Sequence, residues 1–234
     1  MDTEGDAIHA LEHYVREASI ETIWPLRSGG GHPEKMTLVL SGGVGVVAKP
    51  ANDQRTSVQA RREVAARVLA VELGLDALVP VTVLRSMPRN AEADAETEGS
   101  AQVLWPRFKT ALENALNAGT CPGGSDVSWP IAVFDSLAAN EDRHMGNWGV
   151  IDPVSGQKRV VLIDHGLAFA TSSAGEFAGH HRGEEIPDAL LLRVEEFVHS
   201  RRNSALHDVL DEVEATAVFE RARVMLKTRQ LDVR

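Results

Sequence analysis

Four carboxylates, two histidines and two asparagines lie in the stretch NEDRHMGNWGVIDPVSGQKRVVLIDHGLAFA, which runs from Asn140 to Ala170. Asp142 is followed five residues later by Asn147, and Asp164 follows the apolar run VVLI. Like charges that lie side by side cost free energy unless a cation or a shared proton compensates them. Oxygen ligands of this kind suit a hard cation such as Mg²⁺ better than zinc. The stretch therefore predicts a magnesium site.

A second group of residues, in the N-terminal half, has the types that bind nucleotide phosphates. Lys49 ends the apolar run VVAK, where an ammonium group is costly to bury unless it is paired, and Glu63 is a partner of the right sign. Glycine-rich turns lie at 29–31 and at 42–45. Either turn could present backbone N–H groups to phosphates. We favour 29–31, because a two-residue hairpin next to Lys49 is too tight to wrap a triphosphate.

In chain order these residues form the set that phosphoryl transfer requires. A glycine-rich loop, a strand lysine, a helix glutamate, an aspartate with a following asparagine, and a metal-binding aspartate are the parts of a kinase. The spelling differs from that of typical protein kinases. DRHMGN keeps the spacing of HRDxxxxN, but His144 follows Arg143 instead of preceding the aspartate, and IDHG stands where DFG would.

The surrounding patterns predict an α+β protein with two lobes: a small β-rich N-lobe at about 1–105 and a mostly helical C-lobe at about 109–234, within one domain. Hydrophobic periodicity and turn residues give the expected elements. They are helices at 6–18, 57–73, 109–118, 127–140, 187–201, 204–213 and 214–229, and strands at 20–26, in 37–50 around a Gly-Gly hairpin, and at 77–87, 101–108, 147–152 and 159–164. A polar loop is expected at 88–100.

Composition limits the function classes. The 234-residue chain has a net charge of -10, which argues against a surface that binds duplex nucleic acid, because phosphates require clustered Lys and Arg. Cys121 is the single cysteine, so an intrachain disulfide is excluded and a reducing compartment is indicated. No apolar run reaches transmembrane length, and no secretory signal pattern opens the sequence. A cytoplasmic protein without a membrane partner is expected.

The segments FDSLAANEDRHMGNWGV and VVLIDHGLAF contain N-x-D-R-H-x-x-N followed by I-D-x-G. This spelling resembles the HipA-like and phosphoinositide-kinase-like branch of the protein-kinase-like superfamily. The resemblance runs in order from Lys49 to Phe169, about half of the chain. It implies a two-lobed protein-kinase-like fold with ATP and Mg²⁺ as cofactors.

The resemblance also implies a role for each residue that matches a motif. Asp142 orients the proton of the attacking hydroxyl, and Asn147 and Asp164 hold Mg²⁺. Arg143 and His144 support the loop rather than react. Lys49 contacts the phosphates and pairs with Glu63. The nucleotide-binding set is then Gly29, Gly30, Gly31, Lys49, Glu63, Leu104 and Trp105, the last two in the segment that contacts adenine.

The implied activity is transfer of the γ-phosphoryl group of Mg-ATP to a hydroxyl of a protein (Ser/Thr) or a small molecule, with an antitoxin-type protein as a further partner. HipA-like kinases carry a phosphorylatable serine in the glycine-rich loop, and Ser28 has that position. A pseudokinase that only binds nucleotide and an adenylyltransferase on the same fold remain alternatives. A metal hydrolase fits poorly, because no HxxxH or HxH spacing lies near the carboxylates.

Overall fold

The computed structural model describes residues 3–26, 35–105, 107–113, 125–151, 159–170, 181 and 183–231. The chain divides into two compact units, which are Met1–Val64 with Pro80–Pro106, and Ala65–Val79 with Arg107–Arg234. The long helix α2, Gln54–Glu72, contributes its first half to the first unit and its second half to the other.

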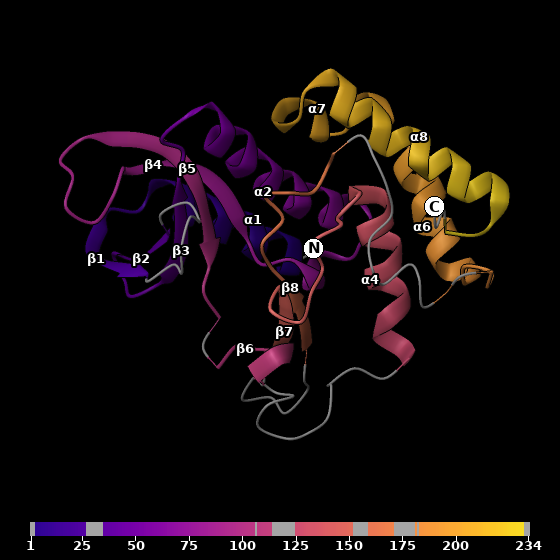
Figure 1. The fold of residues 1–234 in the computed structure, drawn as a ribbon, viewed down its shortest axis with the longest axis horizontal. Helices are drawn as coiled ribbons and strands as arrows, with labels where there is room; N and C mark the ends of the chain where they lie inside the picture. Colours follow the sequence, from indigo (N-terminus) through magenta and orange to yellow (C-terminus); the bar gives the residue numbers. More distant parts are fainter. Residues whose placement is uncertain are drawn as a thin grey trace. The chain divides into compact units, whose positions relative to one another are not determined.

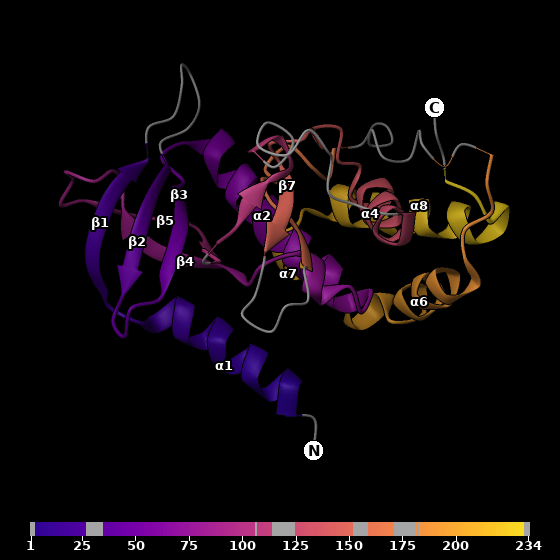
Figure 2. The same ribbon diagram turned by 90° about the horizontal axis from the view of Figure 1, so that it is seen from below.

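A five-stranded antiparallel sheet with the order β1-β2-β3-β5-β4 forms the first unit (Figure 2). Its strands are β1 (Ile20–Leu26), β2 (Lys35–Leu40), β3 (Gly45–Pro50), β4 (Thr82–Pro88) and β5 (Glu96–Val103). In β2 and β3, buried residues alternate with half-buried ones, as expected for strands that turn one face to a core. The register places Lys49 opposite Ser100 of β5.

Helix α1, Thr3–Glu17, contacts β4 and β5 and closes the core of this unit. Arg85 of β4 is largely buried and donates hydrogen bonds of 2.8 Å to the carbonyls of Val15 and Ala18. These carbonyls lie at the end of α1, where backbone acceptors have no partner within the helix. Burial lowers the pKa of Arg85 from its ordinary value.

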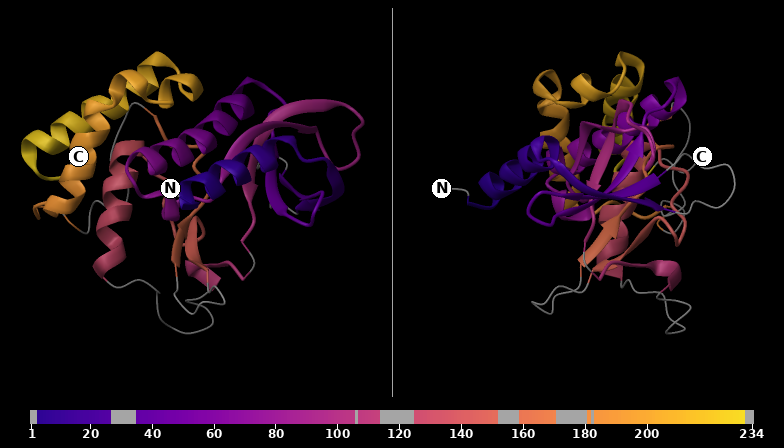
Figure 3. Two further views of the ribbon diagram at one scale, coloured as in Figure 1. Left: turned by 180° about the vertical axis from the view of Figure 1, so that it is seen from behind. Right: turned by 90° about the vertical axis from the view of Figure 1, so that its left-hand side faces the viewer.

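The second unit is mostly helical, and α8 packs against α4 and α6 (Figures 1 and 3). Its elements are η1 (Asp76–Leu78), α4 (Ser125–Ala138), α6 (Asp188–His199), η2 (Arg201–Asn203), α7 (Leu206–Val209), α8 (Glu212–Thr228) and an antiparallel sheet of β6 (Lys109–Thr110), β7 (Trp148–Ile151) and β8 (Arg159–Leu162). Phe197 of α6 stacks on Phe219 of α8 with ring centroids 4.7 Å apart.

The structure confirms the predicted α+β class, with a β-rich first part and a helical second part. The boundaries of β4 and β5 differ from the prediction. The expected loop at 88–100 is wrong in its second half, because β5 begins at Glu96 and pairs with β4 from that residue onward. Strand pairing compensates the weak strand preference of these polar residues. Strand β4 begins only at Thr82, since Pro80 and the 3₁₀ turn η1 precede it.

Two helix predictions also need correction. The expected helix at 204–213 is a single turn, α7, because Leu210 is extended and Asp211 begins a new helix. The Asp211 side chain accepts the backbone N–H of Glu214 at 2.8 Å, which is an N-cap. The expected helix at 109–118 starts two residues late: 109–110 form strand β6, 111–113 are helical as predicted, and 114–118 lie outside the described part. None of the described helices is both long enough and apolar enough to span a membrane.

Candidate active site

Lys49 and Glu63 form an ion pair in the first unit. Lys49 lies near the end of β3, and Glu63 lies on α2, fourteen residues later. The Lys49 Nζ atom donates to Glu63 Oε1. The glutamate side chain is only 2% exposed, whereas the lysine side chain is 19% exposed. The pair thus holds a nearly buried carboxylate against an ammonium group that keeps some access to solvent.

The loop that carries Asp142 begins at the end of α4. Ala139 adopts a left-handed conformation with φ of 46°, and the N–H of Asn140 donates to the carbonyl of Asp135 at 2.9 Å. This 6→1 hydrogen bond after a left-handed residue is the Schellman arrangement that ends many helices. The chain therefore leaves α4 at a defined angle and enters the loop at Asn140.

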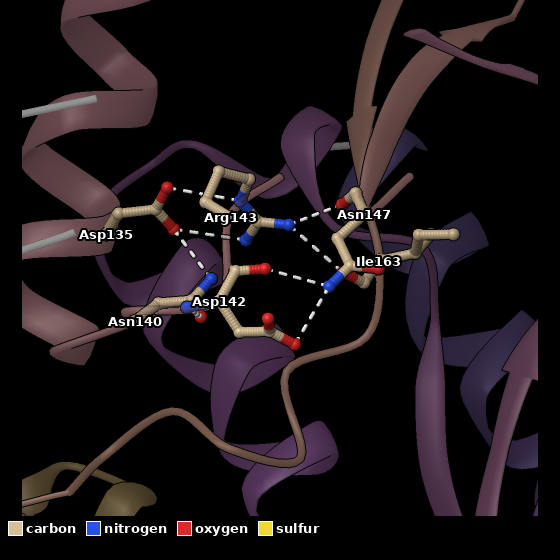
Figure 4. A network of polar contacts seen from close by, with 6 residues as sticks. All are labelled: Asp135, Asn140, Asp142, Arg143, Asn147 and Ile163. Carbon is tan, nitrogen blue, oxygen red and sulfur yellow. Dashed lines mark hydrogen bonds and ion pairs between the residues drawn. The ribbon is translucent and has the colours of Figure 1, made fainter. Parts of the chain in front are cut away.

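A buried polar network holds this loop (Figure 4). Arg143 is 1% exposed and Asp135 is fully buried. The guanidinium donates Nε to Asp135 Oδ2 at 3.1 Å and Nη2 to Asp135 Oδ1 at 3.0 Å. The same Oδ1 atom accepts Asn140 Nδ2 at 3.1 Å. A bidentate pair of this kind fixes the plane of the guanidinium group.

The remaining contacts join Asp142 and Asn147 to Ile163, which follows β8 at the end of the β7–β8 hairpin. Arg143 Nη1 donates to the carbonyl of Asn147 and, at 3.0 Å, to that of Ile163. Asn147 Nδ2 donates to the backbone oxygen of Asp142 at 2.8 Å and to its Oδ2 at 3.2 Å. The N–H of Ile163 donates to the carbonyl of Asn147 at 2.9 Å, which places Asp164 one residue beyond this contact. The structure thus brings the three residues of the predicted metal site into one loop cluster.

The segment around Asp164 has a strained backbone. Asp164 has φ of 60° and Phe169 has φ of 65°, and neither is glycine. The N–H of Phe169 donates to the carbonyl of Ala138 at the end of α4. Between them, His165 is fully buried, and its ring meets that of Phe134 edge to face at 5.7 Å. Non-glycine residues in such conformations cluster at functional sites, where the surrounding structure holds them.

The donor set fits a magnesium ion that a nucleotide helps to coordinate. Both hydrogen bonds given above for the Asn147 side chain use Nδ2, so its Oδ1 is the atom that a metal would take. Asp164 adds carboxylate oxygens. Mg²⁺ is usually held by one or two protein oxygens together with substrate phosphates and water. Within the described ranges no group of three or more His, Cys, Asp or Glu side chains could hold a metal ion.

The other predicted residues are placed as follows. Leu104 and Trp105 follow β5 and are partly exposed, and the N–H of Leu104 donates to the carbonyl of Gly45 at 2.9 Å. Leu104 therefore could offer adenine its carbonyl and its side chain, but not this N–H. His144 is exposed, and its Nε2 lies 3.9 Å from Asp142 Oδ1. Ser28, Gly29, Gly30 and Gly31 lie outside the described residues, between β1 and β2.

Sequence reasoning missed Asp135. The residue stands in the run PIAVFDSLAA, where nearly every neighbour is apolar. A carboxylate within an apolar helix must be buried or must turn away from the core, and a buried carboxylate requires a partner. The position of Asp135 in an apolar helix therefore indicated a buried ion pair, but the sequence did not show which residue is its partner.

These features together define a protein-kinase-like fold, with a lysine on β3 paired to the following helix and an aspartate-asparagine loop in the helical part. Solved structures share this fold. The Golgi casein kinase with Mn/ADP bound matches with a TM-score of 0.65 and 14% identity over 97% of this chain and 76% of that one. The hydra Fam20 structure with sugar matches with a TM-score of 0.68 and 14% identity over 98% and 90%.

A third likeness is to the Helicobacter pylori proinflammatory kinase CtkA, with a TM-score of 0.53 and 13% identity over 93% of this chain and 95% of that one. No protein-family model and no curated protein matches the sequence. At these identities the likeness establishes the fold, and the chemistry is argued from this chain's own residues.

Proposed function

We propose that the protein is an ATP-dependent phosphotransferase that acts on a hydroxyl group of a protein or a small molecule. One observation supports the proposal: in a kinase-like fold, Lys49 is paired to Glu63, and Asp142 is hydrogen-bonded to Asn147, as phosphoryl transfer requires. The similar Golgi casein kinase binds Mn/ADP, which supports a nucleotide and a divalent metal as the ligands here.

Each residue has a separate task. Lys49, held by Glu63, would contact the α and β phosphates. Asn147 Oδ1 and Asp164 would hold the metal ion. When bound, Mg²⁺ would neutralise charge that develops on the transferring phosphoryl group. Asp142 has a half-exposed carboxylate, of which Oδ2 accepts Asn147 Nδ2. It would accept or orient the proton of the acceptor hydroxyl.

Labelled ATP tests the proposal against both alternatives. The purified protein is incubated with Mg²⁺ and either γ-labelled or α-labelled ATP, with a cell lysate as the source of acceptors. Transfer of the γ label that disappears in Asp142→Ala supports a kinase, and transfer of the α label supports an adenylyltransferase. A nucleotide-binding protein that transfers neither label is a pseudokinase. Comparison of the phosphoproteomes of cells that express wild type and Asp142→Ala would then identify the acceptor.

The finer assignment, to the HipA-like branch, rests on the motifs around Asp142 and Asp164 and stays a prediction. A cytoplasmic location and an antitoxin-type partner also stay predictions.

The HipA-like assignment has one direct test at Ser28. A phosphate adds almost two negative charges and would compete with ATP for Lys49, so activity should fall when Ser28 is phosphorylated. Mass spectrometry after incubation with Mg-ATP decides, because full activity of the phosphorylated protein contradicts this regulation.

A further inference from the structure

Asp135 is a buried carboxylate to which the mechanism above gives no task. It lies on α4, and its side chain has no exposure to solvent. Both of its oxygens accept hydrogen bonds from Arg143, and one of them also accepts the Asn140 side chain. Its backbone carbonyl accepts the N–H of Asn140 as well. One residue therefore fixes both the end of α4 and the first half of the loop.

The contacts continue from Asp135 to the predicted metal ligands. Arg143 uses Nε and Nη2 for Asp135, and it uses Nη1 for the carbonyls of Asn147 and Ile163. Asn147 is itself a predicted ligand, and Ile163 directly precedes the other ligand, Asp164. Figure 4 shows the guanidinium group between the carboxylate of Asp135 and these two carbonyls. Because the guanidinium is planar and rigid, its orientation at one end sets the position of the backbone at the other.

This arrangement depends on the negative charge of Asp135. A guanidinium group cannot lose its proton in a protein, and burial without a counter-charge is costly. If Asp135 lost its charge, Arg143 would be drawn toward solvent, and the carbonyls of Asn147 and Ile163 would lose their shared donor. If Asp135 only helped α4 to pack, neither its negative charge nor its bidentate contact with Arg143 would be needed.

We propose that Asp135 is a positioning residue, whose carboxylate orients Arg143 and thereby holds Asn147 and Asp164 where both can bind one metal ion. Its effect on metal binding rests on the proposed function. Groups that hydrogen-bond to the residues around a metal typically change metal affinity by about 10–100-fold when they are removed. We expect a change of that size for Asp135→Asn, although Asp135 does not touch the metal.

The experiment measures binding and loop order separately, on the full chain. Binding of Mn²⁺ in the presence of ADP is followed by electron paramagnetic resonance of free Mn²⁺. Amide hydrogen exchange is followed by mass spectrometry in peptides that cover 140–151 and 159–165. For Asp135→Asn we expect the dissociation constant for Mn²⁺ to rise by about tenfold or more, with loss of protection in these two peptides.

Glu72→Gln is the matched control. Glu72 is a partly buried carboxylate of the same unit, and it accepts Ser204 Oγ at 2.7 Å and the N–H of Ala205 at 2.8 Å. None of these contacts involves the loop. The control should alter stability but leave Mn²⁺ affinity and exchange in the two peptides at wild-type values. An equal loss of affinity in the control would mean that general destabilisation, and not positioning, explains the result.

A double variant, Asp135→Asn with Arg143→Gln, keeps the test decisive if the single variant does not fold. It leaves no unpaired charge in the core, so its stability should exceed that of Asp135→Asn. It still lacks the guanidinium bridge, so its Mn²⁺ affinity should stay about tenfold or more below wild type. Wild-type affinity and protection in a folded variant of either kind would overturn the proposal.

The two proposals can fail separately. If wild type binds no Mn²⁺ with ADP, the proposed function fails, and the exchange data alone decide whether Asp135 orders the loop. If wild type binds the pair and Asp135→Asn binds it equally well, the function stands and the positioning role is refuted.

Discussion

Substitution of Lys49 and substitution of Glu63 should lower the stability of the protein by different amounts. Lys49→Met removes the ammonium and leaves a carboxylate that is 2% exposed, whereas Glu63→Gln leaves an ammonium that is 19% exposed. The loss of a counter-charge costs a charged group more free energy the more completely that group is shielded from water. Lys49→Met should therefore destabilise the protein more than Glu63→Gln does.

The burial of each partner gives the magnitudes. Removal of one partner of a buried ion pair costs about 3–5 kcal/mol. For Lys49→Met we expect about 3 kcal/mol, the lower end of this range, because the lysine side chain is itself 19% exposed. For Glu63→Gln we expect about 1.5 kcal/mol, because the amide oxygen can still accept from Lys49 and the ammonium keeps some access to water. The double variant leaves no charge and should be more stable than Lys49→Met alone. For a chain of this size, about 3 kcal/mol corresponds to a fall in Tm of about 6–12 °C.

Thermal unfolding followed by circular dichroism, together with urea unfolding, measures all four proteins at one pH. The reasoning would be refuted if Glu63→Gln were the more destabilised single variant. It would also be refuted if the effects of the two substitutions simply added in the double variant, because additivity means that the two groups do not interact.

Three further predictions follow from the second unit. Asp164→Asn should abolish transfer of the γ label and leave the circular dichroism spectrum unchanged, because the metal contributes several kcal/mol of transition-state stabilisation; activity at ordinary Mg²⁺ concentrations would reject the assignment. Asp142→Ala should lower turnover by about 10²–10⁴-fold while ADP binding persists, and a variant with near-normal turnover would show that another group handles the proton. Burial raises the pKa of Glu72 above its ordinary value of 4.5, so the stabilising contribution of this group is present below that pH and is lost as pH rises through the folded-state pKa. Urea unfolding should accordingly show the stability of wild type relative to Glu72→Gln falling as the pH rises above 4.5, and a constant difference would contradict this.

The sequence determined the residue types of the candidate site and their order. Lys49 and Glu63 could be proposed as partners because an ammonium in an apolar strand requires a counter-charge, and the next helix offers one. Asp142 and Asn147 lie five residues apart, so a single loop can bring their side chains into contact. Local patterns of this kind also predicted β1, β2, β3 and the main helices, since alternation and helical periodicity are properties of neighbouring residues.

Only the tertiary structure decided what Asp135 and Arg143 do and where β5 begins. The start of β5 at Glu96 depends on pairing with β4, and the charged residues there carry no strand signal of their own. From the sequence alone, Asp135 could have paired with any basic side chain of the second unit. Its partner is Arg143 because the Schellman turn at Ala139 ends α4 and leads into the loop, and the residues that flank the β7–β8 hairpin supply carbonyls for the rest of the guanidinium group. Packing between elements sets such a contact, because a buried charge requires a counter-charge nearby. Spacing along the chain does not encode which counter-charge that is.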